Sequence, residues 1–274
     1  MKKIIALIMA MAMVLALGAC TTKKAEKSTK KHEVVEGETE SAEALDTASE
    51  GTLVIGYTIY EPMNYEDENG EFTGFDTELA KAVCEKLGVE PEFVEIDWDN
   101  KFLELDSRNI DCIWNGMTIT DEVKKNADVT KAYVKNAQVV VMKADRVKDI
   151  KSVDDLKGLK FAAEAGSAGE EAIVDSGLDE NYVATAAQTD ALLEVESGAA
   201  DACVIDITMA NAMTGANTSY SDLAAGLELT SEEYGIAFAK GSNLTEKVND
   251  ALDELKKDGT LDKLAEKYAL TLAF

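Results

Sequence analysis

Short apolar runs rich in β-branched and aromatic residues alternate with helical patterns from residue 51 onward. Runs of this length, bounded by turn residues, predict strands. The alternation of strands and helices predicts an α/β architecture with largely parallel sheets. The expected strands are Thr52–Tyr57, Glu92–Ile96, Ile110–Trp114, Gln138–Met142, Leu159–Ala163, Tyr182–Thr185, Ala202–Ile205 and Tyr234–Phe238.

The helical patterns carry their own start and stop signals. Asp76 is expected to cap a helix that Gly88 ends, and Ser152 and Asp155 have the spacing of a capping box. An acidic helix is expected after Thr118, with Val123 as its third residue. The last third is helical, with one apolar stripe made by Leu244, Val248, Leu252 and Leu255.

Polar and aromatic residues gather where the expected strands end. In open α/β sheets, ligands bind beyond the carboxyl ends of the strands. These ends offer aromatic faces, hydroxyls, carboxylates and glycines beside helix starts, which is what a pocket for a small zwitterion needs. They are Tyr57–Tyr60, Ile96–Trp98, Asn115–Thr118, Glu164–Ser167 and Ile205–Asp206.

Composition narrows the function classes. A chain of 274 residues with 46% hydrophobic content can build one large domain or two small ones. The formal net charge of −26 disfavours nucleic acid as a partner. The single histidine, His32, lies in a polar segment, so the folded part has no His-based metal site or Ser-His-Asp triad. We expect no metal, no cofactor and no catalysis.

The N-terminus reads as a targeting segment. Two lysines precede an apolar run that is too short to span a membrane comfortably, and a Leu-Gly-Ala-Cys sequence ends it at Cys20. This ending resembles the bacterial lipoprotein box, which implies a signal peptide over 1–19 and a lipidated Cys20. An ordinary secretory signal is the alternative. Residues 20–50 are polar and are expected to form a disordered tether.

Three further cysteines, Cys84, Cys112 and Cys203, lie in apolar patterns. They are expected to be small buried residues rather than a disulfide framework, with a Cys84–Cys112 pair left open.

Motifs in register from about residue 51 to the end resemble the extracellular solute-binding proteins of polar amino acid ABC transporters. One such motif would be a weak signal, but eight in order are a strong one. They are Gly51–Gly56, Gly70–Asp76, Leu79–Ala82, Asp111–Asp121, Asp155–Gly158, Ala165–Ser167, Ala200–Ala202 and Tyr234–Phe238.

The resemblance implies a type II periplasmic-binding-protein fold, with two mixed sheets flanked by helices and joined by a two-strand hinge. Lobe 1 is expected over 51–132 and 235–274, lobe 2 over 138–229, and the hinges over 133–137 and 230–234. The same resemblance implies an extracytoplasmic monomer, held to the membrane only by its lipid anchor. Its partner would be a permease with its ATPase.

The resemblance also implies a ligand site between the lobes. Tyr60 and Trp98 match aromatic walls, although both could be core aromatics. Ser167, with Ala168, matches a helix start that receives the ligand carboxylate, and Asp206 matches the carboxylate that holds the ammonium. The remaining contacts are expected from Asn115, Gly116, Thr118 and Glu164. Thr118 and Ser167 could also be helix caps, and Glu164 could instead face solvent.

Val123 departs from the family pattern, which usually has a carboxylate-binding arginine at this position. The two arginines of the chain, Arg108 and Arg146, lie in no matching motif. Two ligand classes stay open. Backbone N–H groups around Thr118 and Ser167 could hold an amino acid carboxylate, while Glu164 selects a cationic or amide side chain. The ligand could instead be an amine or another cation. We favour the amino acid.

Two other classes of protein share this fold. Cyclohexadienyl dehydratases resemble the family and act as secreted lyases, and Glu164 is the one candidate for their general acid or base. A sensor lobe of a receptor is the other class, but no kinase or cyclase follows Phe274 in the sequence.

Overall fold

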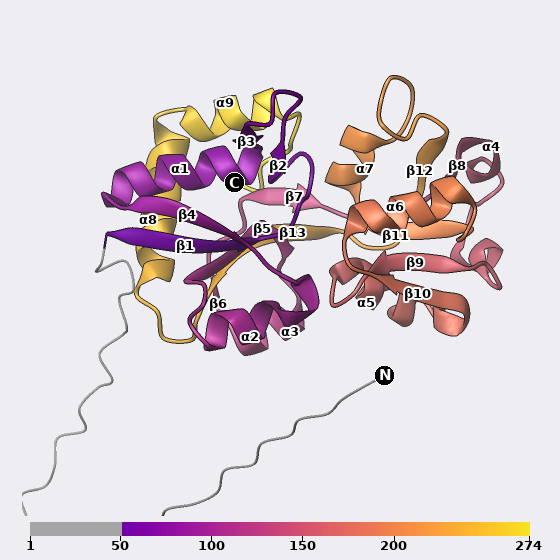
Figure 1. Cartoon of the computed structure of the whole chain (residues 1–274), viewed down its shortest axis with the longest axis horizontal. Coiled ribbons are helices and arrows are strands. Elements are labelled where there is room, and N and C mark those ends of the chain that lie inside the picture. Colours follow the sequence, from indigo (N-terminus) through magenta and orange to yellow (C-terminus); the bar gives the residue numbers. More distant parts are fainter. Residues whose placement is uncertain (1–50) are drawn as a thin grey trace, which may run out of the picture. The chain divides into compact units, whose positions relative to one another are not determined.

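The computed structural model describes residues 51–274 (Figure 1). The expected signal peptide, the tether and the lipidation of Cys20 lie outside these residues and stay predictions. Between residues 51 and 274 no helix is both long and apolar enough to cross a membrane.

The first sheet has the strand order β4-β1-β5-β13-β6, with β7 paired to β13. β1 runs parallel to β4 and β5, whereas β13 runs antiparallel to β5, β6 and β7. These strands are β1 (Thr52–Tyr57), β4 (Glu90–Glu95), β5 (Cys112–Thr118), β6 (Asp128–Val129), β7 (Val134–Asn136) and β13 (Glu232–Phe238). The accompanying helices are α1 (Phe75–Leu87), α2 (Lys101–Asp106), α3 (Asp121–Asn126), α8 (Leu244–Lys257) and α9 (Thr260–Lys267).

The second sheet has the order β10-β9-β11-β8-β12, again with parallel and antiparallel pairs. Both sheets are therefore mixed, as predicted. The strands are β8 (Gln138–Lys143), β9 (Phe161–Glu164), β10 (Tyr182–Thr185), β11 (Ala202–Asp206) and β12 (Leu223–Glu228). The helices are α4 (Ala144–Val147), α5 (Ala168–Asp175), α6 (Gln188–Ser197) and α7 (Ile207–Met213). A short hairpin, β2 (Tyr65–Glu66) with β3 (Phe72–Thr73), completes the strands of the described residues.

Strand β5 shows why the central strands read as apolar runs. Its residues alternate between two hydrophobic clusters: Cys112 and Trp114 join the one that contains α1 and α8, and Ile113 and Met117 join the one that contains α2 and α3. Figure 1 shows α1 on one side of β1 and β4 and the pair α2 and α3 on the other. Because both faces are covered, every residue of β5 is buried.

All eight predicted strands overlap strands of the structure, but β5 extends to Thr118. Asn115, Gly116 and Thr118 therefore belong to the strand instead of following it. The prediction that Asp76 caps α1 was wrong. Gly74 is the cap, at φ +125°, where a Cβ would lie 2.2 Å from the Met63 carbonyl oxygen. Asp76 lies in the first turn, and its buried carboxylate accepts bonds from Gly116 N–H and the Tyr133 hydroxyl.

Several start and stop signals were confirmed. Ser152 and Asp155 form the capping box, although the element that follows is a 3₁₀ turn, Val153–Leu156. Gly88 ends α1 in the left-handed conformation. Val123 is the third residue of α3, and the four residues of the predicted α8 stripe are buried.

The chain passes between the two sheets at two places. It leaves β7 and enters β8 through Ala137, and it returns from β12 to β13 through residues 229–231.

Cys84, Cys112 and Cys203 are buried free thiols. The structure therefore contains no disulfide between Cys84 and Cys112. In a Cys20→Ser variant, we expect a thiol reagent to find no reactive cysteine in the native protein and three after unfolding. Burial raises the pKa of Cys84 to about 12, which also suppresses its thiolate. A count of one thiol after unfolding would instead show that Cys84 and Cys112 pair.

Candidate functional site

Residues from both sheets meet at one cavity of about 300 Å³. It lies where β5, β9 and β11 end beside the starts of α3 and α5, which places polar side chains from distant parts of the chain together. Eight of the nine predicted ligand-binding residues line it: Trp98, Asn115, Gly116, Thr118, Glu164, Ser167, Ala168 and Asp206.

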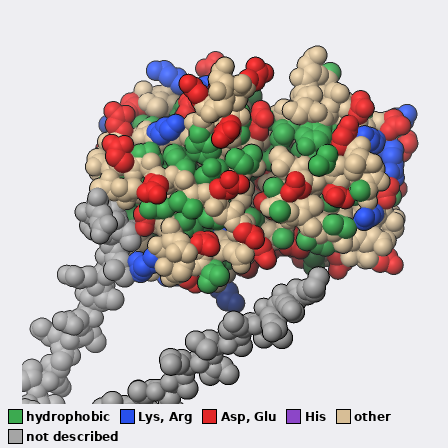
Figure 2. Space-filling view, viewed as in Figure 1, with side chains coloured by type: hydrophobic (Ala, Val, Ile, Leu, Met, Phe, Trp, Pro, Cys, Tyr) green, Lys and Arg blue, Asp and Glu red, His purple; other side chains and the backbone are tan. Residues whose placement is uncertain are grey.

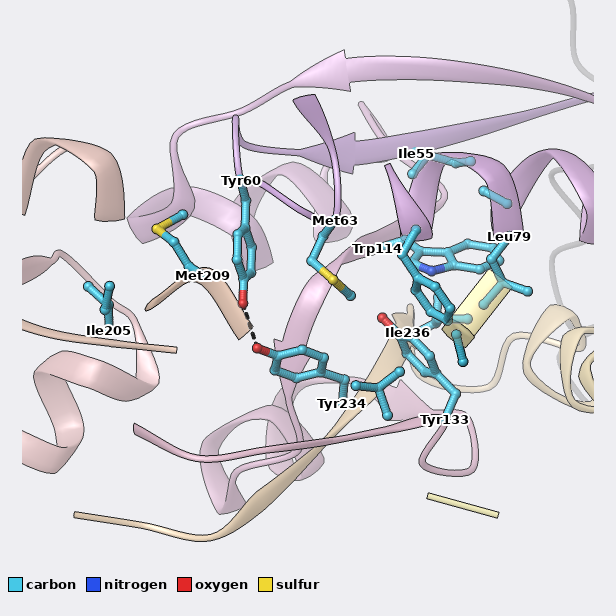
Figure 3. Close-up of a cluster of buried hydrophobic side chains, with 14 of the residues drawn as sticks. Ile55, Tyr60, Met63, Leu79, Trp114, Tyr133, Ile205, Met209, Tyr234 and Ile236 are labelled. Atoms are coloured by element: carbon cyan, nitrogen blue, oxygen red, sulfur yellow. Dashed lines mark hydrogen bonds between the residues drawn. The ribbon is translucent and has the colours of Figure 1, made fainter. Parts of the chain in front are cut away.

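Tyr60 is the ninth predicted residue, and it is not among the residues that line this cavity. The residue is 2% exposed, and its hydroxyl is hydrogen-bonded to Thr208 Oγ1 at 2.5 Å and to the Tyr234 hydroxyl at 2.6 Å. Figure 3 shows the Tyr60 and Tyr234 hydroxyls facing each other. Tyr60 thus has the contacts of a core aromatic, which the sequence left as the alternative.

The β5 residues that line the cavity already have partners. The Asn115 amide bonds to Thr58 and Asn64, and the Gly116 N–H donates to Asp76 at 2.6 Å. The Thr118 hydroxyl donates to Glu232 Oε1 at 2.7 Å, and Thr120, not Thr118, caps α3. Gly116 must be a glycine, because its φ is +54° and a Cβ would lie 2.7 Å from the Tyr60 ring.

Helix α5 begins at the cavity, which Ser167 and Ala168 line. Ser167 is its cap, and the Ser167 hydroxyl accepts the Glu170 N–H at 3.2 Å. The N–H groups of Ala168 and Gly169 precede the first intrahelical bond, so the helix provides no partner for them. Such a helix start attracts a carboxylate through its N–H groups and its dipole.

Asp206 is buried at the end of β11. Its Oδ1 accepts bonds from Asn136, from Gln138 at 2.9 Å and from the Tyr234 hydroxyl at 2.8 Å, and its Oδ2 accepts one from Gln188. All four donors are neutral, so no cation of the described chain balances its charge. Burial and the nearby charge of Glu232 raise the pKa of Asp206 to about 7.

Glu164 is also buried, so the alternative that it faces solvent was wrong. It is the last residue of β9, it is 3% exposed, and its Oε1 has no hydrogen-bond partner in the described structure. Burial and the charge of Asp206 raise the pKa of Glu164 to about 8, against the lowering effect of Lys101. An unpartnered buried carboxyl oxygen is costly, so this position favours a ligand that donates a hydrogen bond.

The sequence reasoning missed Lys101 and Gln188, which also line the cavity. Gln188, the first residue of α6, is hydrogen-bonded to the carboxylate and the backbone N–H of Asp206. Lys101 is buried and follows Trp98 by three residues. That spacing, one helical turn, places the two side chains on the same face and could have revealed Lys101.

The charged side chains that line the cavity are mostly acidic. Six carboxylate side chains line it, and among them only Glu164 and Asp206 are buried. Among residues 51–274, Lys101 is the one cationic residue that lines the cavity. Figure 2 shows Asp and Glu side chains spread over one face of the molecule. Val123 lines the cavity without a charge, and Arg146 instead pairs with Asp201 at 2.8 Å.

Residues 53–271 match the bacterial extracellular solute-binding proteins, family 3. The chain belongs to this family. The L-cystine-binding protein TcyJ of Escherichia coli (strain K12) is 32% identical over 80% of the chain and 82% of that protein.

Solved structures show the same fold. A mutant of ArgBP from T. maritima is 38% identical, with a TM-score of 0.74 over 80% of this chain and 96% of that one. The ancestral amino acid-binding protein AncCDT-1, a precursor of cyclohexadienyl dehydratase, is 37% identical, with a TM-score of 0.72 over 80% and 96%. The fold of this family 3 protein is thus the type II periplasmic-binding-protein fold. The matched relatives are binding proteins, and the family is extracellular.

Proposed function

We propose that this family 3 protein captures a polar or cationic amino acid in the 300 Å³ cavity as the binding component of an ABC importer. The observation that carries the proposal is that buried Asp206 and the start of α5 face one cavity. A carboxylate among neutral donors attracts the ammonium of an amino acid, and a helix start attracts its carboxylate. Glu164 adds an acceptor for a cationic or amide side chain.

The two sheets are the cores of two lobes, with the boundaries that the sequence predicts. The lobes meet directly at Lys101, whose Nζ donates to the Gly166 carbonyl oxygen at 2.7 Å. A ligand that contacts both lobes stabilises the closed arrangement by its greater affinity for it. The strands at 133–137 and 230–234 act as the hinge, and the closed lobes form the surface that a permease with its ATPase recognises.

The protein acts as a monomer outside the cytoplasm, anchored through a lipid on Cys20. Lipidation keeps the binding lobes near the permease, and the polar segment 20–50 gives them reach.

The alternatives are an amine ligand and a lyase activity. The free donors at the start of α5 favour a ligand with a carboxylate over an amine. AncCDT-1, which is related to a dehydratase, is itself named an amino acid-binding protein, and we propose no catalysis here.

Thermal unfolding of the purified protein tests the proposal. The protein is first unfolded and refolded to remove bound ligand, and then heated with each common L-amino acid, with cystine and with the corresponding decarboxylated amines. A ligand at 100 times its Kd should stabilise the protein by about 2.7 kcal/mol. We expect an amino acid to stabilise it and its amine to do so far less. Stabilisation by amines alone would contradict an amino acid ligand.

A further inference from the structure

Lys101 is a buried cation in the cavity of the proposed amino acid site. It begins α2, and its side chain reaches from the first sheet across to the loop before α5, with only 4% of the residue exposed. Its Nζ lies 5.2 Å from the centre of the Trp98 ring and 5.0 Å from that of Phe102.

The Lys101 ammonium has no ion-pair partner among residues 51–274, although burial, which lowers its pKa, is opposed by the nearby charges of Glu122, Glu164, Asp99 and Glu170. Its two hydrogen bonds go to backbone carbonyl oxygens, those of Gly166 at 2.7 Å and Trp98 at 3.3 Å. An ammonium has three donors, so one stays unused. An anion held in the cavity would further oppose the lowering of this pKa by burial.

The unused donor lies beside the anion-attracting end of α5. Gly166, which accepts the bond from Nζ, is followed by Ser167, the cap of that helix. A Cβ on Gly166 would lie 2.9 Å from Asp99 Oδ1 and 3.4 Å from Lys101 Nζ, so glycine permits this close approach. A carboxylate at the helix start would therefore meet the Ala168 N–H as well as the Lys101 ammonium.

Resting on the proposed function, we propose that Lys101 holds the carboxylate of the bound amino acid in a cavity where Val123 supplies no cation. The buried charges of the cavity then match an amino acid in sign. Lys101 faces the carboxylate, Asp206 faces the ammonium, and Glu164 accepts a donor from the side chain.

The other role open to Lys101 is purely structural, as a cross-cleft bond to Gly166. A structural lysine would matter equally for every ligand that closes the cleft. A carboxylate-binding lysine would matter only for ligands with a carboxylate. Matched pairs of ligands separate the two roles: L-arginine and agmatine, L-glutamine and 4-aminobutanamide, and L-histidine and histamine.

Calorimetry with these pairs tests the assignment in a Lys101→Met variant. We expect amino acid affinity to fall about 10- to 150-fold, the range for a hydrogen bond to a charged group. Amine affinity should stay the same or rise. Lys101→Arg should keep amino acid affinity within a few-fold, and Val123→Arg should restore it in the Lys101→Met background. Lys125→Met, on the exposed side of α3, also removes one positive charge. It should change neither the affinity for amino acids nor the affinity for amines.

Two results would overturn this inference alone. One is amino acid binding that Lys101→Met leaves within twofold, and the other is an equal loss for amino acids and amines. If Lys101→Met fails to fold, Lys101→Gln is measured in the same way. Failure of every amino acid to stabilise the wild-type protein would instead overturn the proposed function.

Discussion

Replacing Asp206 by asparagine is expected to weaken amino acid binding about 10- to 150-fold. The change keeps the shape of the side chain and removes the negative charge that we propose binds the ligand ammonium. Hydrogen bonds to charged groups contribute about 1.5–3 kcal/mol, and each 1.36 kcal/mol corresponds to a factor of ten in affinity. Isothermal titration of the wild-type and Asp206→Asn proteins measures the loss directly.

The network around Asp206 decides how this experiment must be controlled. Asn136, Gln138, Tyr234 and Gln188 all donate to its carboxylate, so Asp206→Ala would leave four buried donors without a partner. Each such group costs about 1–3 kcal/mol, and an alanine variant would lose folding stability as well as affinity.

Asparagine keeps one acceptor oxygen, and titrations well below the unfolding temperature separate affinity from stability. Asp179→Asn, at an exposed position, is the matched control for loss of one charge. Unchanged binding in Asp206→Asn would remove Asp206 from the site.

The donors to Asp206 come from the segments that join the two sheets. Asn136 ends β7, Gln138 begins β8, and Tyr234 belongs to β13. Asn136 and Gln138 also donate to Glu232 Oε1, so two carboxylates share these amides at the crossing. A ligand ammonium that binds Asp206 therefore interacts with a carboxylate that is hydrogen-bonded to the proposed hinge strands.

The sequence could predict the features that local patterns determine. Strand positions follow from short apolar runs, and the Ser167 cap follows from a hydroxyl before a helix. Gly88 ends α1 as expected because only glycine adopts its left-handed conformation at little cost. The set of strand ends also proved informative, since most of the predicted residues line one cavity.

Features that depend on distant partners could not be predicted in the same way. Asp76 looks like a cap, but its carboxylate bonds to Gly116 and Tyr133, which lie 40 and 57 residues away. Tyr60 follows a strand, yet its hydroxyl meets Thr208, 148 residues later. The spacing from Trp98 places Lys101 beside the cavity, but its bond to the Gly166 carbonyl oxygen, in the loop between β9 and α5, could not be predicted from local pattern. In each case the deciding contact is tertiary.

The pH dependence of binding is expected to be steep below pH 8 because Glu164 and Asp206 are buried carboxylates. The pKa of Glu164 is raised from its ordinary 4.5 to about 8, so the ligand-free protein holds a proton there at neutral pH. Its contribution to folding stability is full below pH 4.5 and is lost as the pH rises through about 8, because the folded state binds the extra proton.

A cationic ligand has the opposite preference. It binds the ionised carboxylates, so binding below pH 8 must release protons, and affinity should rise with pH. One coupled proton gives at most about a tenfold change per pH unit, or about a hundredfold from pH 6 to 8. Titrations with L-arginine in buffers of different ionisation enthalpy measure both the affinity and the number of protons released. L-Histidine is unsuitable because it titrates in this range.

Two further groups that line the cavity have shifted pKa values: burial raises the pKa of Glu171 and lowers that of Lys101. The single histidine, His32, lies outside the described residues, and Asp76, whose pKa burial raises to about 7, does not line the cavity. Asp76 should therefore affect the pH dependence of stability but not that of binding. In Glu164→Gln, the rise of affinity with pH should become shallower, and the part that remains should be due chiefly to Asp206. A wild-type affinity that is constant from pH 6 to 8, or an identical slope in Glu164→Gln, would show that Glu164 does not face the ligand.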